Sequence, residues 1–191
     1  MRKSLLVRQV LPSLLWYALL IATALGVDFL LHRVGLYWIG RYLGIAGTLV
    51  LISSFAYSLR KRQILKRGSP KTLLQWHEAL SWVGVLMILI HAGVHFNAVL
   101  PWAAVALMLI AVASGFTGKY LLKEARERLR TREAALREAG LTDEELADKL
   151  LLDSLTVDAM KKWRAVHLPI TAVFGLLAVL HMASILIFWR W

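Results

Sequence analysis

The segment HEALSWVGVLMILIH, residues 77–91, is an apolar stretch with a histidine at each end. A second segment, HLPITAVFGLLAVLH at residues 167–181, repeats this separation of 14 residues between its histidines. On an α-helix 14 residues make close to four turns, so both histidines of a segment share nearly one face, about 21 Å apart along the axis. The two segments therefore predict two helices that each carry a pair of imidazoles at matching heights.

The composition around these segments is typical of a membrane protein. The chain has 191 residues, of which 59% are hydrophobic, and it contains no cysteine. This is too apolar for an ordinary soluble domain, and the length leaves no room for a large soluble catalytic domain. Without cysteine, disulfides, Cys-ligated iron–sulfur clusters and covalent c-type haem attachment are excluded.

The hydrophobic runs predict an all-α integral membrane protein, a bundle of five transmembrane helices that forms one domain over residues 1–191. Between the fourth and fifth spans, a polar insert carries alternating Arg and Glu, a glycine at 140 and a Thr142–Glu145 capping box. These features predict a helical hairpin, which serves either as a solvated connector or as a docking surface for a soluble electron donor. The predicted spans are residues 11–31, 41–59, 74–99, 101–122 and 166–189, and the insert is residues 123–163.

The net charge of +11 comes mainly from the N-terminus and from the loop of residues 60–71, while residues 119–164 carry 11 basic and 10 acidic residues. Because positive loops stay inside, we expect a cytoplasmic N-terminus, a cytoplasmic hairpin and an outer C-terminus, in the inner membrane of a bacterium. The charge is thus explained by topology, and we expect no nucleic-acid partner. The bilayer is the expected environment, and the apolar outer faces leave an oligomer open.

This topology gives the third and fifth spans the same direction. His77 and His167 then both lie near the cytoplasmic face, and His91 and His181 both lie near the outer face. Two facing imidazoles are the axial ligands of a low-spin b-type haem, so the pattern predicts two haem b groups with these four iron ligands. Structural or proton-relay histidines and a transition-metal transporter are the alternatives. The transporter alternative is weakened because Glu78 is the one carboxylate close to these histidines.

Small and basic residues near the histidines fit a haem. Gly84 lies midway between His77 and His91, and Gly175 lies near the middle of the other pair. A helix pressed against a macrocycle needs such a groove, although ordinary helix packing also uses glycine. Arg164 on the inner side and Arg41 on the outer side are candidate partners for haem propionates, or else lipid-headgroup anchors.

The motif Trp76-His77-Glu78 … His91-Ala-Gly-Val-His95, followed by Trp163-Arg164-Ala-Val-His167 … His181, resembles the ferric reductase-like transmembrane family, which includes the membrane part of NADPH oxidases. The resemblance covers the second to fifth spans and implies two b haems between two parallel helices. It places His95 beside the outer haem, where oxygen or a metal is reduced, and Arg41 near the same outer site. From the residues alone, His95 is equally read as an interfacial histidine without a role.

The resemblance implies transmembrane electron transfer from a cytoplasmic-side donor to an outer-side acceptor, which is oxygen or superoxide, ferric iron or a partner protein. The family's sixth span and its flavin- and nicotinamide-binding domain have no counterpart in the sequence. We therefore expect a separate cytoplasmic reductase or a quinol as donor. The alternatives are a haem-binding redox-sensing or anchor subunit of a larger complex and a quinol-oxidising cytochrome b, so whether the chain is itself an enzyme stays open.

Overall fold

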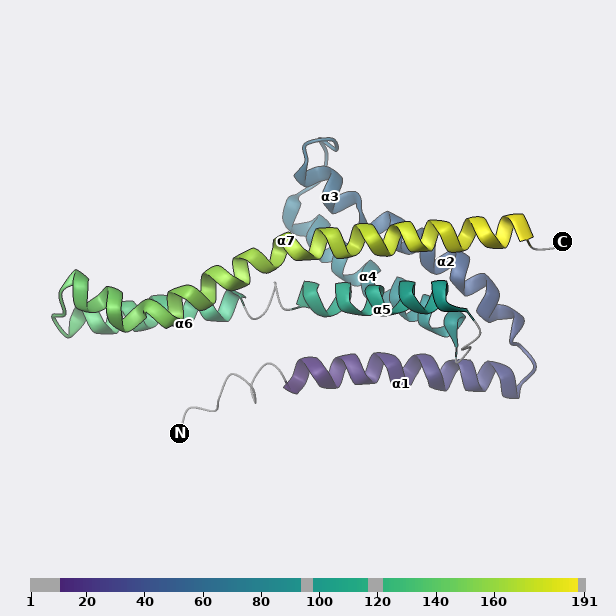
Figure 1. The fold of residues 1–191 in the computed structure, drawn as a ribbon, viewed down its shortest axis with the longest axis horizontal. Helices are drawn as coiled ribbons and strands as arrows, with labels where there is room; N and C mark the ends of the chain where they lie inside the picture. The colour runs from purple at the N-terminus through teal and green to yellow at the C-terminus, as the bar shows by residue number, and fades with distance from the viewer. Residues whose placement is uncertain (1–10, 94–97, 117–121, 189–191) are drawn as a thin grey trace. The chain divides into compact units, whose positions relative to one another are not determined.

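Helices make up nearly all of the described chain, which confirms the predicted all-α class (Figure 1). The computed structural model describes residues 11–93, 98–116 and 122–188, and no β-strand occurs in these ranges. The helices are α1 (Leu11–Arg33), α2 (Trp38–Ser54), α3 (Ala56–Lys61), α4 (Pro70–Ala92), α5 (Val99–Phe116), α6 (Leu122–Glu138) and α7 (Asp143–Phe188).

Four helical stretches are long and apolar enough to cross a membrane. They are Leu14–Arg33, Trp38–Lys61, Pro70–Ala92 and Ala165–Phe188, and the apolar part of α5, Val99–Gly115, is shorter. Large apolar side chains on these stretches are widely exposed, up to 80% at Phe188 near the end of α7. Such surfaces suit lipid, where the backbone hydrogen bonds of a helix are satisfied internally.

The chain divides into two compact units, one of Leu14–Val105 and the other made mainly of the residues from Ala106 onward, a boundary that lies within α5. In the first unit α2 and α4 pack along each other, and the short helix α3 also contacts α4. The predicted second span is thus two helices that meet at Phe55. The hydroxyls of Ser53 and Ser54 donate to the carbonyls of Leu49 and Leu51, and such back-bonding bends a helix.

The ends of α4 follow from local backbone chemistry. Ser69 is extended and Pro70 occupies the first turn, where the missing N–H of proline costs no helical hydrogen bond. At the other end Gly93 adopts a φ of 52°, which takes the chain out of the helix. The helix therefore ends at Ala92, before the predicted boundary at residue 99, and Val99 already belongs to α5.

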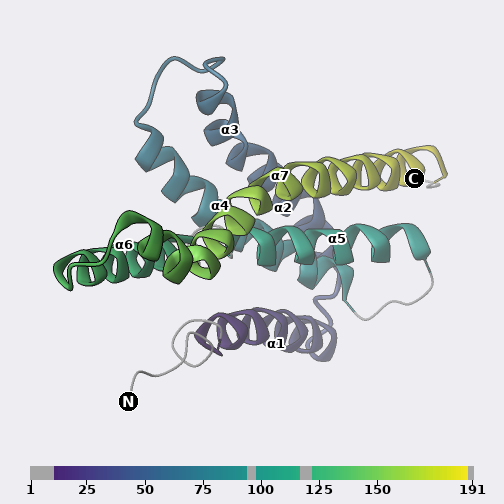
Figure 2. The same cartoon turned by 60° about the vertical axis from the view of Figure 1, so that its left-hand side comes forward.

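In the second unit α6 and the first turns of α7 lie side by side, joined by a tight turn (Figures 1 and 2). Gly140 has a φ of 77°, and its amide donates to Arg137, which closes α6 in a Schellman-type end. The Thr142–Glu145 capping box is confirmed: the Thr142 amide donates to Glu145 Oε2 at 2.9 Å, and the Glu145 amide donates back to Thr142 Oγ1 at 3.5 Å.

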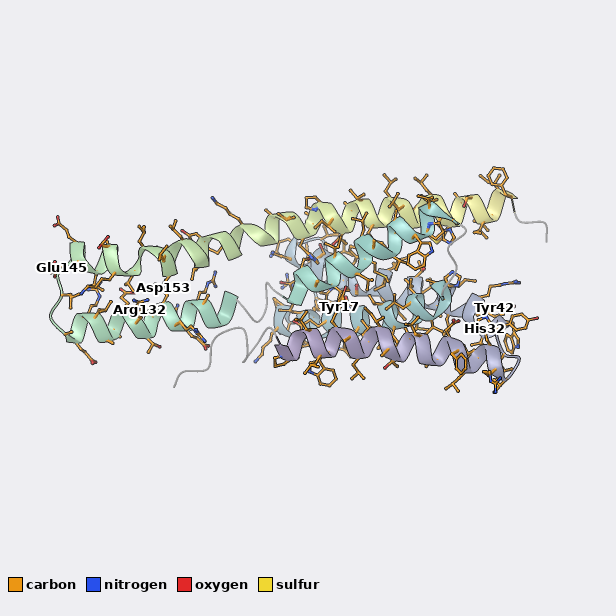
Figure 3. All side chains as sticks on the ribbon, turned by 60° about the horizontal axis from the view of Figure 1, so that its bottom comes forward. Tyr17, His32, Tyr42, Arg132, Glu145 and Asp153 are labelled. Carbon is orange, nitrogen blue, oxygen red and sulfur yellow. The ribbon has the colours of Figure 1, made fainter. Side chains whose placement is uncertain are left out.

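Contacts along α6 and α7 combine an apolar strip with exposed ion pairs, among them Arg137 with Asp143 at 3.6 Å. Ala125 and Leu129 of α6 pack with Val157 of α7. Arg132 of α6 donates to Asp153 of α7 at 2.7 Å, and both side chains lie between the two helices in Figure 3. The apolar strip excludes water between the helices, while the exposed ion pairs add little energy of their own.

Helix α7 runs without interruption for 46 residues, from Asp143 to Phe188. The sequence predicted that the fifth span begins near residue 166, apart from the helices of the polar insert. Instead Pro169 lies inside the helix, where it has no N–H to donate to the carbonyl of Ala165. The residues before it, Lys161 to Ala165, include good helix formers, and these carry the helix across the polar–apolar boundary.

Candidate functional site

Both histidines of α4 are held by backbone carbonyls of α2. The ring atom Nδ1 of His77 lies 3.0 Å from the carbonyl oxygen of Ser54, and Nδ1 of His91 lies 3.0 Å from that of Gly40. The two carbonyls are 14 residues apart, like the two histidines. The earlier carbonyl, of Gly40, binds the later histidine, and the later carbonyl, of Ser54, binds the earlier histidine. Two antiparallel helices thus anchor both imidazoles in one register.

These hydrogen bonds determine which ring nitrogen carries the proton. A carbonyl oxygen only accepts, so Nδ1 of His77 and Nδ1 of His91 must be the donors. In a neutral imidazole the lone pair then resides on Nε2, the atom available to a metal. Metal-binding histidines generally donate their other N–H in this way, which orients the ring and raises its basicity. The α4 histidines therefore fit axial haem ligation.

The ring of His91 lies directly against the backbone of α2 at Gly44. A Cβ at residue 44 would lie 2.7 Å from Cγ and Cδ2 of His91, closer than carbon atoms approach without displacement. At the other end Ser54 is the last residue of α2, where helical carbonyls lack the next amide donor. The ring of Tyr57, in α3, lies beside His77 with 5.9 Å between centroids.

His167, in α7, has a hydroxyl rather than a carbonyl against its ring. Its Nδ1 is hydrogen-bonded to Oγ of Ser114 in α5, a residue only 1% exposed. Ser114 also donates its hydroxyl proton to the carbonyl of Ala111 at 2.7 Å. Cε1 of His167 would lie 3.8 Å from a Cβ built on Gly115, an ordinary contact.

His181 lies on the same helix, partly buried like His167. Its backbone carbonyl accepts the hydroxyl of Ser184 at 2.7 Å, and the carbonyl of His167 accepts the hydroxyl of Thr171 at 2.8 Å. Both histidines of α7 are therefore followed by a hydroxyl residue that bonds the helix itself rather than the ring.

The two predicted groove glycines lie in different surroundings. Gly84 is packed against α2: a Cβ there would lie 2.8 Å from Leu51 and 3.1 Å from the carbonyl of Gly47. Its local role is close helix packing, the alternative that the sequence had left open. A Cβ on Gly175 would meet no described atom within 4 Å, and the contact of this glycine with a macrocycle stays a prediction.

Three further residues were predicted to lie near the haems: Arg41, His95 and Arg164. Arg41 follows directly after Gly40, whose carbonyl holds His91, so it lies at the His91 end of α2. His95 lies outside the described residues. Arg164 belongs to α7, but its side chain also lies outside the description.

Sequence reasoning missed the acceptors that orient three of the histidines: the carbonyls of Gly40 and Ser54 and the hydroxyl of Ser114. It also missed Gly44, which admits the His91 ring. One signal was available, because residues 40 and 54 have the same 14-residue separation as the histidines. Every residue has a carbonyl, however, so residues 40 and 54 can be identified as the acceptors only when the pairing of α2 with α4 is known.

Comparisons with protein-family models, with curated proteins and with solved structures found no match for this chain. The resemblance to the ferric reductase-like transmembrane family therefore rests on the spacing and context of the histidines and stays a prediction.

Proposed function

We propose that this chain is a di-haem cytochrome b that transfers electrons across a membrane. In this proposal His77 and His167 ligate a haem near the cytoplasmic face, and His91 and His181 ligate a haem near the outer face. The observation that carries it is the presentation of the α4 histidines: both donate Nδ1–H to α2 carbonyls at 3.0 Å, which leaves both Nε2 lone pairs for metal.

Three features support the pairing with α7. His167 and His181 repeat the 14-residue separation, so α4 and α7, if parallel, would present their imidazoles at equal heights. His167 carries a hydrogen-bond partner on Nδ1, as the α4 histidines do. The open face at Gly175 offers room beside the helix for a macrocycle.

When bound, each haem supplies one-electron chemistry at its iron. The chain's own contribution is to supply four imidazoles, to hold three of them in one tautomer through hydrogen-bond acceptors, and to surround them with apolar helices that exclude water. We expect Arg41 and His95 to serve the outer acceptor, which is oxygen, ferric iron or a partner protein. Arg164 is expected to neutralise a propionate on the cytoplasmic side, where the donor is a separate reductase or a quinol.

A redox-sensing subunit is the second candidate, and the unbroken α7 favours it. One helix connects the capped turn at Thr142, through Pro169, to both His167 and His181. We place α6 and the first turns of α7 in the cytoplasm as a helical hairpin, because positive loops stay inside. A partner bound there would be mechanically connected to two haem ligands.

Purified protein reconstituted into vesicles with trapped ferricyanide separates these functions. External dithionite is expected to reduce the trapped ferricyanide faster than in protein-free vesicles, and His91→Ala is expected to abolish the difference by removing an outer ligand. Two bound haems without faster reduction would contradict a conduit and favour the sensing subunit.

A further inference from the structure

Two polar residues are buried among those that the structure describes, and each lies against a predicted haem ligand. Ser54 is 4% exposed and its carbonyl holds His77, while Ser114 is 1% exposed and its hydroxyl contacts His167. Burying a hydroxyl in an apolar segment costs free energy unless the group is hydrogen-bonded. The burial of Ser114 is therefore explained in part by its hydrogen bonds to Ala111 and His167.

The direction of the protons at Ser114 follows from its bonds. The hydroxyl has one proton, which it donates to the Ala111 carbonyl at 2.7 Å. Toward His167 the oxygen is then the acceptor, and Nδ1 of the imidazole is the donor. A hydroxyl that donates in one direction is polarised and accepts more strongly in the other. Ser114 thus selects the Nδ1-protonated tautomer of His167 and its ring orientation.

We propose that Ser114 is a positioning residue that tunes the haem bound by His167, an inference that rests on the proposed function. By accepting the Nδ1 proton, the hydroxyl raises the basicity of Nε2 toward the iron. A more basic ligand stabilises ferric iron over ferrous iron and lowers the reduction potential. The acceptor for His167 is a side chain, whereas the acceptors for His77 and His91 belong to the backbone. Among these three ligands, His167 is therefore the one whose ring bond a single substitution can remove.

The test is a redox titration of the purified full-length protein, followed by the visible spectra of the two haems. Ser114→Ala is expected to raise the potential of one haem, with an approximately tenfold change in its ferric–ferrous equilibrium, about 59 mV for a one-electron couple. The other haem is expected to keep its potential. Ser114→Thr retains a hydroxyl and is expected to titrate close to wild type.

Thr171→Val is the matched control. The Thr171 hydroxyl donates to the backbone carbonyl of His167 at 2.8 Å, so its removal perturbs the same residue without touching the ring. Both potentials are expected to remain at their wild-type values. An equal shift in Thr171→Val and Ser114→Ala would overturn the proposal, because it would show a general packing effect on α7.

The remaining outcomes are also decisive. Unchanged potentials in Ser114→Ala overturn the role of Ser114. If Ser114→Ala instead loses one haem and Ser114→Thr keeps both, that result supports the role. If Ser114→Ala does not fold, Ser114→Cys keeps the volume with a weaker acceptor and is expected to shift the same potential upward. A wild-type protein without haem overturns the proposed function itself, whereas two wild-type haems with unmoved potentials overturn only this inference.

Discussion

Replacing Gly44 by alanine tests whether the fold is built around the His91 ring. The added Cβ would lie 2.7 Å from two ring carbons of His91 and 2.8 Å from a third, so one group must move. The imidazole is the movable partner, because Gly44 is part of the α2 backbone. Turning the ring away breaks its 3.0 Å hydrogen bond to the carbonyl of Gly40 and redirects Nε2.

The energies predict that Gly44→Ala weakens haem binding more than it lowers the stability of the fold. Losing the hydrogen bond costs about 1 kcal/mol, and an off-rotamer ring costs on the order of 1 kcal/mol more. Alanine in place of glycine returns about 1 kcal/mol within a helix. Gly44→Ala is therefore expected to destabilise the fold by only about 1 kcal/mol, while loss of the hydrogen bond that orients a metal-binding histidine typically weakens metal binding by roughly 10- to 100-fold.

The assay pairs thermal unfolding with haem quantitation on the same preparation. Gly44→Ala is expected to melt close to wild type and to hold one haem instead of two. Gly26→Ala in α1 is the control, since a Cβ there meets nothing within 4 Å. Full haem content in Gly44→Ala would refute the reasoning, because it would show that the position of the His91 ring does not matter for binding.

Two further predictions concern packing and capping. Gly84→Ala places a Cβ 2.8 Å from Leu51 and is expected to cost about 1–3 kcal/mol of stability, which Leu51→Ala in the same chain partly restores. The control Gly26→Ala, whose Cβ meets nothing within 4 Å, is expected to melt like wild type, and equal melting of the Gly84 and Gly26 variants would contradict this packing. The amide and hydroxyl of Thr142 hold the pKa of the Glu145 carboxyl below its usual value, so the start of α7 is stabilised above about pH 4.3 and loses protection as the pH falls below it. Hydrogen exchange of the first α7 amides measures this, and Glu145→Gln, which retains the capping geometry, is expected to remove the pH dependence.

The sequence predicted best what depends on periodicity and local chemistry. The helical class follows from long apolar runs, and the Thr142–Glu145 capping box follows from two residues three positions apart. The orientation of the histidines was beyond such reasoning, because its determinants are backbone carbonyls of a neighbouring helix. Only the pairing of α2 with α4 turns Gly40 and Ser54 into partners of particular side chains.

Helix boundaries were predicted less well, since competing local effects are close in energy. The fifth span was expected to begin near residue 166, yet the helix formers before Pro169 extend α7 back to Asp143. The break at Phe55 was not predicted, because the hydroxyls of Ser53 and Ser54 act there through bonds to their own helix. In both places a few side chains decide between continuing and ending a helix.

The most direct test of the account is a reduced-minus-oxidised visible spectrum of the purified wild-type protein, with pyridine haemochrome quantitation. The account predicts a b-type spectrum and two haems per chain, with one haem remaining in His91→Ala. A colourless protein from haem-replete expression would contradict it, and the histidines would then be assigned to structure or to a proton relay.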